Sequence, residues 1–146
     1  MELPAVPPSA SLRHRARVRT RWSDEDNHGV LNNAVYMTLM EEARHSYFDA
    51  LGLLAGARFP FVLAQANVLF LRPGRGAAEV EVEMGTLHLG TSAFVQASRI
   101  VEAASSRAWC EAVARMVAVD ERGQSCPIPP EFRRRVAEFE GLRAEG

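Results

Sequence analysis

The residues best suited to chemistry lie between positions 24 and 33, where the sequence reads Asp-Glu-Asp-Asn-His-Gly-Val-Leu-Asn-Asn. This segment falls between a predicted strand and the longest predicted helix. The start of a helix presents unpaired backbone N–H groups and a partial positive charge, which stabilise an anion or a developing oxyanion. A carboxylate beside a helix start therefore offers the two groups that acyl-transfer chemistry needs.

Asp24 and Asp26 also have a structural interpretation, because aspartate accepts backbone hydrogen bonds in turns and before helices. We favour that role for Asp24. Asp26 shares its segment with the imidazole of His28, a tight turn at Gly29 and the helix start. Residue types alone leave turn formation and catalysis equally open for Asp26.

The same segment superficially matches a calcium-binding loop, with carboxylates at the first and third places and glycine at the sixth. His28 replaces an oxygen ligand, however, and Val35 stands where that loop requires glutamate. Asp24, Asp26 and His28 are able to ligate a transition metal, but the sequence supplies no clear cluster for the remaining ligands. We expect no metal and no cofactor.

Catalysis by a serine or cysteine nucleophile has less support. The chain lacks a Gly-x-Ser-x-Gly motif, and its two cysteines, Cys110 and Cys126, have no identifiable activating base. Their spacing fits neither a zinc nor a redox motif, so we expect free thiols. Gly74-Arg75-Gly76 does not match a phosphate-binding fingerprint and is interpreted as a turn.

Composition is typical of one domain with a real core, since the 146 residues are 47% hydrophobic. We place this domain at residues 13–142, after a flexible N-terminal tail at 1–12. The tail has no continuous apolar run, so we predict neither a signal peptide nor a membrane span and expect a cytoplasmic protein. The net charge of −1 argues against broad attraction to nucleic acid or membranes.

All 17 basic residues are arginines, and five of them alternate with other residues at positions 13–21. Alternation predicts a strand through position 22 with one arginine face. Such a face binds phosphate or is a solvated surface that discourages edge pairing, and we favour the second interpretation. Glutamates alternate at 79, 81 and 83, and their acidic face would be able to pair with arginines across a sheet.

A long apolar helix is predicted from Asn32 or Asn33, either of which can cap it, to about Leu54. Its wide apolar stripe indicates burial against a broad surface. Strands are predicted at about 61–71, 78–89, 92–102 and 107–120, with short antiparallel connections, before a terminal helix at 131–142. This order predicts an α+β fold in which a single sheet wraps the helix. The other face of the sheet needs cover, so we expect a dimer.

The segment around the site resembles a known family. The resemblance is carried by Arg21-Trp22-Ser23-Asp24-x-Asp26-x-x-Gly29-Val30-Leu31-Asn32-Asn33-x-x-Tyr36 and then by Glu41-Glu42-Ala43-Arg44. These motifs are similar to those of hot-dog-fold acyl-CoA thioesterases of the 4-hydroxybenzoyl-CoA thioesterase type, and the similarity continues at 70–73, 89–94 and 127–129. The resemblance implies a long central helix wrapped by a five- to six-stranded antiparallel sheet, and a homodimer or homotetramer.

The resemblance also implies roles for individual residues. Asp26 becomes the catalytic carboxylate, as nucleophile or general base, and the backbone N–H of Asn33 polarises the thioester carbonyl of an acyl-CoA or acyl-carrier-protein substrate. The Asn33 side chain would meanwhile cap the helix. The implied substrate-binding residues are Gly29, Tyr36, Arg72 and Ser92. An apolar acyl pocket shared between subunits is expected to use Tyr36, Met40, Phe61 and Val62.

Two features depart from the family pattern. Many relatives have histidine directly after the glycine of the motif, where this chain has Val30, and we interpret the displaced His28 as an exposed turn residue rather than a substitute site group. The basic cluster near the Ser-Phe strand is missing from residues 87–92. The coenzyme A phosphates would then need Arg72, Arg75 or the arginines of the first strand.

Two alternatives remain open besides hydrolysis. A hot-dog hydratase or dehydratase needs a catalytic histidine with an acid, and His28 is the histidine near the site. A non-hydrolytic binding module for acyl thioesters would use the same pocket without turnover. Binding of nucleic acid by the arginine face is the least favoured function.

Overall fold

The protein, described by a computed structural model at residues 2–54 and 59–143, folds into one antiparallel sheet and two helices. Two short 3₁₀ helices, marked η, lie among the longer elements. In chain order the elements are η1 (Ser9–Ser11), β1 (His14–Arg19), η2 (Trp22–Asp24), α1 (Asn33–Ala50), β2 (Phe61–Phe70), β3 (Glu79–Leu89), β4 (Ala93–Glu102), β5 (Ala108–Ala118) and α2 (Pro130–Glu140). Within these described ranges, no helix combines the length and apolar character needed to cross a membrane.

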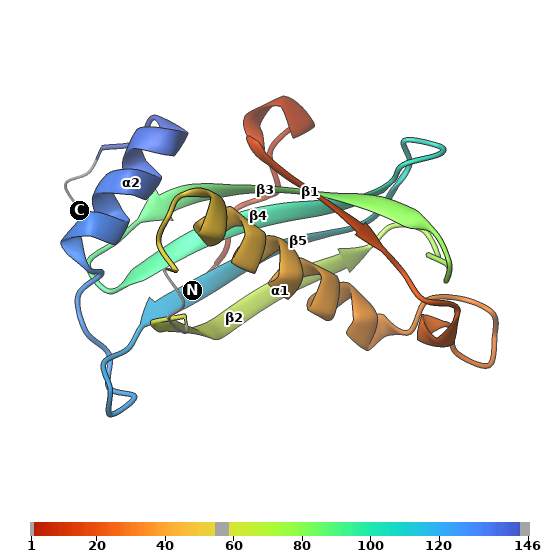
Figure 1. Ribbon diagram of the computed structural model, residues 1–146, viewed down its shortest axis with the longest axis horizontal. Helices are drawn as coiled ribbons and strands as arrows, with labels where there is room; N and C mark the ends of the chain where they lie inside the picture. Colours follow the sequence, from red (N-terminus) through yellow and green to blue (C-terminus); the bar gives the residue numbers. More distant parts are fainter. Residues whose placement is uncertain (1, 55–58, 144–146) are drawn as a thin grey trace.

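The five strands lie in the order β1-β3-β4-β5-β2, so β1 and β2 form the two edges (Figure 1). Helix α1 lies across one face of the sheet (Figure 1). This arrangement confirms the predicted α+β fold with a long helix against an antiparallel sheet. The predicted strands agree with β2 to β5 to within two residues at each end.

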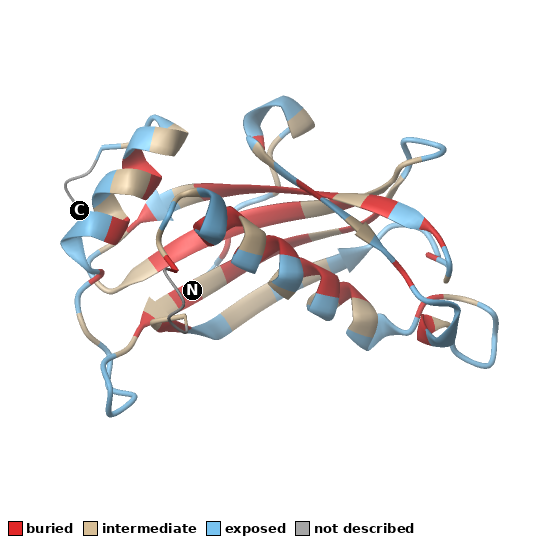
Figure 2. Cartoon of the chain, viewed as in Figure 1, coloured by how far each residue is buried: buried red, intermediate tan, exposed pale blue. Residues whose placement is uncertain are grey.

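Helix α1 begins after Asn32, whose Oδ1 accepts a hydrogen bond from the Ala34 N–H at 3.0 Å. It ends at Ala50, four residues before the predicted end, because Gly52 adopts a positive φ of 71° that stops the helix. The side of α1 that faces the sheet is buried (Figure 2). Phe48 is fully buried there and its ring contacts the rings of Tyr47, Phe59, Phe61, Phe94 and Phe132.

The alternating arginines and glutamates lie on neighbouring strands. β1 pairs with β3 in a register that sets Arg15 opposite Glu83 and Arg17 opposite Glu81. Arg15 also reaches Glu81 at 3.1 Å, and Arg17 reaches Glu79 at 3.2 Å. Arg15 and Arg17 are therefore matched by glutamates across the sheet, which favours the structural interpretation of the arginine face. The strand ends at Arg19 rather than at position 22, because the following residues turn into η2.

The N-terminal strap, residues 3–12, runs over the face of the sheet opposite α1 (Figure 1). Leu3 and Leu12 are buried there against Val95, Ala97 and Val113. This packing differs from the expected flexible tail. Apolar contacts offset the entropy of ordering the segment, and the prolines between its two leucines already restrict the backbone.

Candidate active site

Asp26 lies in the loop between η2 and α1, where it builds a tight turn. The Asp26 N–H donates to the Val30 carbonyl at 2.8 Å, and Asp26 Oδ1 accepts from the His28 N–H at 2.7 Å. Gly29 closes the turn with a φ of 75°, which glycine adopts without strain. Asp26 is exposed, and its Oδ2 accepts no hydrogen bond from the described residues. One carboxylate oxygen thus fixes the turn while the other is available.

The backbone N–H of Asn33 is an unpaired donor at the start of α1. It has no hydrogen-bond acceptor within residues 2–54 and 59–143, whereas the next two amides both bond to Asn32. The cap is therefore the side chain of Asn32, and the expected capping role of the Asn33 side chain is wrong. A free amide in the field of the helix dipole suits an oxyanion.

A cavity of about 280 Å³ opens beside this helix start. Its lining residues come from the loop, α1 and the end of β2: Val30, Leu31, Asn33, Tyr36, Phe70, Leu71, Arg72 and Pro73. Three residues predicted from the sequence, Asn33, Tyr36 and Arg72, are thus brought together. Phe70 and Leu71 were not predicted to line the site, although two consecutive apolar residues at the end of an edge strand are a usable signal.

Tyr36 is held rigidly at the back of this cavity. Its hydroxyl accepts a hydrogen bond from the Gly74 N–H at 2.9 Å, and its ring meets that of Phe70 edge-on at 5.2 Å between centroids. Burial raises the pKa of Tyr36, so the hydroxyl keeps its proton at neutral pH. The side chain is thus fixed, and at 2% exposure it supports the cavity from within the core.

Ser92 and Phe61 lie at the opposite end of the sheet. The Ser92 carbonyl accepts the Ala118 N–H at 2.7 Å, and Phe61 pairs with the same Ala118, whereas Phe70 pairs with Cys110. The length of β2 separates its two ends by roughly 30 Å. Met40 is buried in the core and Val62 is exposed. One chain therefore does not assemble the acyl pocket expected from Tyr36, Met40, Phe61 and Val62.

The cationic candidates differ in how far their charge is already matched. Arg75 pairs with Glu102 at 3.0 Å, and Arg15 and Arg17 of β1 pair with glutamates of β3. Arg72 donates weakly to the Ala108 carbonyl at 3.4 Å and has no carboxylate partner in the described part of the chain. Arg72 is therefore the candidate arginine at the cavity whose charge is uncompensated.

The remaining chemical candidates lie apart from this arrangement. The imidazole of His28 is exposed and makes no hydrogen bond to a described residue. Cys110 and Cys126 are free thiols, as predicted, and burial raises the pKa of Cys110 to about 12, which keeps it protonated. Among residues 2–54 and 59–143, no three His, Cys, Asp or Glu side chains are placed to hold a metal ion.

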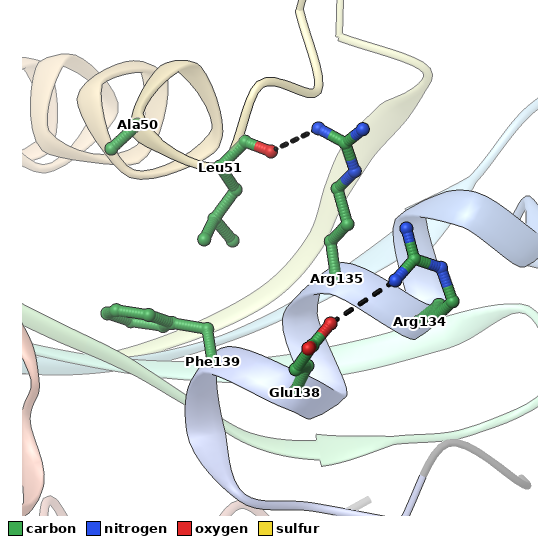
Figure 3. A pocket seen from close by; sticks show the side chains of 6 residues that line it. All are labelled: Ala50, Leu51, Arg134, Arg135, Glu138 and Phe139. Atoms are coloured by element: carbon green, nitrogen blue, oxygen red, sulfur yellow. Dashed lines mark hydrogen bonds and ion pairs between the residues drawn. The ribbon is translucent and has the colours of Figure 1, made fainter.

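A second hollow, of about 370 Å³, lies between α2 and the C-terminal end of α1 (Figure 3). Arg134 pairs with Glu138 at 3.2 Å, and Arg135 donates to the Leu51 carbonyl at 2.8 Å. The length of α1, about 27 Å, separates this hollow from the unpaired amide of Asn33. With these charges already paired and with no link to Asp26, it is not the candidate site.

Asp24 supports the loop from below. It is buried, and its carboxylate accepts from the Arg21 backbone N–H at 2.8 Å and from the Arg21 guanidinium at 2.8 and 3.1 Å. Hydrogen bonds from this guanidinium hold the pKa of Asp24 below its ordinary value. The Asp24 carbonyl also accepts the Asn32 N–H at 2.9 Å. Asp24 thus joins η2 to the start of α1.

Replacing Asp24 with alanine should lower the free energy of unfolding by about 1–2 kcal/mol at pH 7, because charge-assisted hydrogen bonds are lost. A depressed pKa in the folded state means that this stabilisation is present above the ordinary pKa of aspartate and is lost as the pH falls through the folded value. Urea unfolding should show that the difference in free energy of unfolding between the wild type and Asp24→Ala is smaller at pH 3 than at pH 7. A difference that does not change with pH would contradict this prediction. An equally large loss of unfolding free energy in Asp49→Ala, at an exposed position, would also contradict it.

Gly74 follows the cavity residue Pro73 and donates its N–H to the Tyr36 hydroxyl. A Cβ at this position would stand 2.6 Å from the ring of the buried Trp109. We expect Gly74→Ala to destabilise the fold by about 1–3 kcal/mol, because the ring has little space to move. Urea unfolding measures the cost. Trp109→Leu should lower the free energy of unfolding less in the Gly74→Ala protein than in the wild type. Strictly additive effects of the two substitutions would place the clash elsewhere.

The chain is similar to known proteins in both sequence and fold. The thioesterase-like superfamily matches the chain over residues 20–136. A thioesterase from Thermus thermophilus, solved in complex with coenzyme A and zinc, is 31% identical, with a TM-score of 0.77 over 88% of this chain and 95% of the other. A 1,4-dihydroxy-2-naphthoyl-CoA thioesterase from Synechocystis is 17% identical and shares the fold, with a TM-score of 0.76 over 87% and 97%.

Proposed function

Because the chain belongs to the thioesterase-like superfamily, a group of thioester hydrolases, we propose that it hydrolyses acyl-CoA thioesters with the carboxylate of Asp26. One observation carries the assignment of the site. An exposed carboxylate on a rigid turn lies in the same loop as the unpaired N–H of Asn33 at the start of α1. Attack on a carbonyl requires the carboxylate, and stabilisation of the resulting oxyanion requires the N–H.

In the proposed reaction, the thioester oxygen accepts a hydrogen bond from the Asn33 N–H. Asp26 either attacks the carbonyl carbon, giving an anhydride that water then hydrolyses, or removes a proton from a water molecule that attacks directly. In both routes the carbon–sulfur bond breaks. The thiolate leaves and takes up a proton, and the acid is released. The helix dipole favours the negative charge that develops on the oxygen.

The cavity beside Tyr36 and Phe70 is the proposed entrance for the acyl group. Its wall is apolar and aromatic, which suits a hydrophobic acyl chain or ring. Arg72 at its rim offers an uncompensated positive charge for a phosphate of coenzyme A or of a carrier protein's prosthetic group. Gly29 contributes by shaping the turn that carries Asp26.

We further propose that the site is completed in a homodimer. The edge strand β2 exposes a row of large apolar residues, and an apolar edge invites pairing with another strand: Val62, Leu63, Leu69 and Phe70. Antiparallel pairing of two β2 strands would set the start of one against the end of the other. The partner's Phe61 and Ser92 would then lie near Tyr36 and supply the second wall of the pocket.

Measurement of thiol release from a panel of acyl-CoAs tests the function. The panel should span short, medium, long and aromatic acyl groups, with acyl-carrier-protein thioesters of the same acids in parallel. We expect turnover of at least one acyl group. We also propose that residues 13–142 form the catalytic domain and that the protein acts in the cytoplasm. Saturable binding of these thioesters without thiol release would contradict hydrolysis and favour the binding-module alternative.

A further inference from the structure

The N-terminal strap closes the outer face of the sheet, which is the face opposite α1. Leu3 and Leu12 are buried in a small apolar cluster of their own with Val95, Ala97 and Val113, separate from the main core. Leu12 also presses against β3, where a Cβ on Gly85 would stand 3.3 Å from its side chain. The strap therefore provides the cover that this face would otherwise take from another chain.

A set of polar contacts, which we call the clasp, holds the middle of the strap and consists of Arg99, Glu83, Ser9 and the Pro7 carbonyl. Arg99 on β4 donates to the Pro7 carbonyl at 2.9 Å and to Ser9 Oγ at 3.1 Å. Ser9 Oγ in turn donates to Glu83 on β3 at 2.7 Å. The side chains of Glu83 and Arg99 are only 6% and 12% exposed. These hydrogen bonds are therefore largely shielded from water, which strengthens them. The clasp ties a defined length of strap to two central strands.

The surface beneath the strap is suited to a second copy of this chain. Lifting the strap would expose Val95, Ala97 and Val113 as one apolar patch on the twisted sheet. Glu111 and Arg115 flank Val113 on β5 and carry opposite charges, and Glu111 pairs at 3.3 Å with Arg99, the same arginine that holds the strap. Under a two-fold axis the Glu111 of each copy would meet the Arg115 of the other, which is the self-complementary arrangement that symmetric interfaces need.

We propose that the N-terminal strap is a built-in cap that ends assembly at the dimer, by occupying the face on which a second dimer would otherwise stack. The inference rests on the dimer of the proposed function but not on its chemistry. It separates the two assembly states, dimer and tetramer, that the sequence left open. The strap contributes no residue to the loop of Asp26, so assembly and catalysis are measurable independently.

Release of the strap by point substitutions tests this role. Leu3→Ser combined with Val6→Ser removes the apolar anchors in the first half of the strap. Arg99→Gln removes the clasp without changing the strap sequence, and it also removes the ion pairs of Arg99 with Glu83 and Glu111. Glu2→Ser combined with Ala5→Ser is the matched control, because both residues are exposed. Light scattering after size exclusion gives the mass, hydrogen exchange of the amides before position 13 reports release, and thiol release is assayed on the same samples.

We expect the wild type and the control to be dimers with a protected strap. Both release variants should show faster exchange before position 13 and a twofold increase in mass that grows with protein concentration. A freely exchanging strap without a change in mass would overturn the proposal, as would a wild-type tetramer with the strap protected. Protection retained in both release variants would also overturn it, since these contacts would then not hold the strap. A doubled mass without thiol release would instead contradict the proposed function alone.

Discussion

Replacing Asp26 with asparagine should reduce kcat for thiol release from acyl-CoA by about 10²–10⁴-fold, the range lost when an acid–base group is removed. Asparagine suits this test because its amide oxygen can still accept the His28 N–H that Asp26 accepts at 2.7 Å. The turn around Gly29 is therefore kept while the charge is removed. Because both proposed routes need an ionised carboxylate at the carbonyl, KM should change much less than kcat.

Asp49→Asn is the matched control for this variant. Asp49 is exposed at the far end of α1, and the same change in charge there should leave thiol release within about twofold of the wild type. Circular dichroism and urea unfolding establish that both variants are folded. An Asp26→Asn protein that retains wild-type turnover would remove Asp26 from the mechanism. An equal loss in Asp49→Asn would show that net charge, rather than this carboxylate, controls the rate.

Much of the fold is predictable because local patterns and the global structure agree. Arginine and glutamate alternate in two segments, and the register of β1 against β3 pairs them directly. Asn32 caps α1 because a short polar side chain before an apolar run is a local signal that needs no tertiary information. The early ends of β1 and α1 were not predicted. The bonds between Asp24 and Arg21 terminate the first, and the positive φ of Gly52 terminates the second.

Other features depend on contacts that are distant in the sequence. The strap has the composition of a loose tail, and its order follows from Arg99 and the patch beneath it, roughly ninety positions away in the chain. Tyr36 and Ser92 were both assigned to the substrate, yet they lie at opposite ends of the sheet. The chain between Gly74 and Ser92 crosses the length of the sheet as β3, and the hydrogen bond from the Gly74 N–H to the Tyr36 hydroxyl, between residues 38 positions apart, places Tyr36 at the end away from Ser92.

Placing two lysines on the free edge of β2, as Val62→Lys with Leu63→Lys, should convert the proposed dimer into a monomer. Thiol release should then fall by about 100-fold, because the partner's Phe61 and Ser92 would no longer complete the pocket. Val62 and Leu63 are 51% and 41% exposed in the single chain. Substitutions at such positions cost a monomer little, so a large effect on activity reports the contribution of the partner.

Val62→Thr with Leu63→Thr is the matched control for this edge, because threonine favours strands as valine does but carries no charge. We expect this control to remain dimeric and to keep most of its activity. Light scattering and thiol release, measured over a hundredfold range of protein concentration, should show that activity follows the dimer fraction in the lysine variant. A monomeric lysine variant with wild-type turnover would mean that one chain holds the whole site, and the walls of the acyl pocket would then have to come from the cavity beside Tyr36 alone.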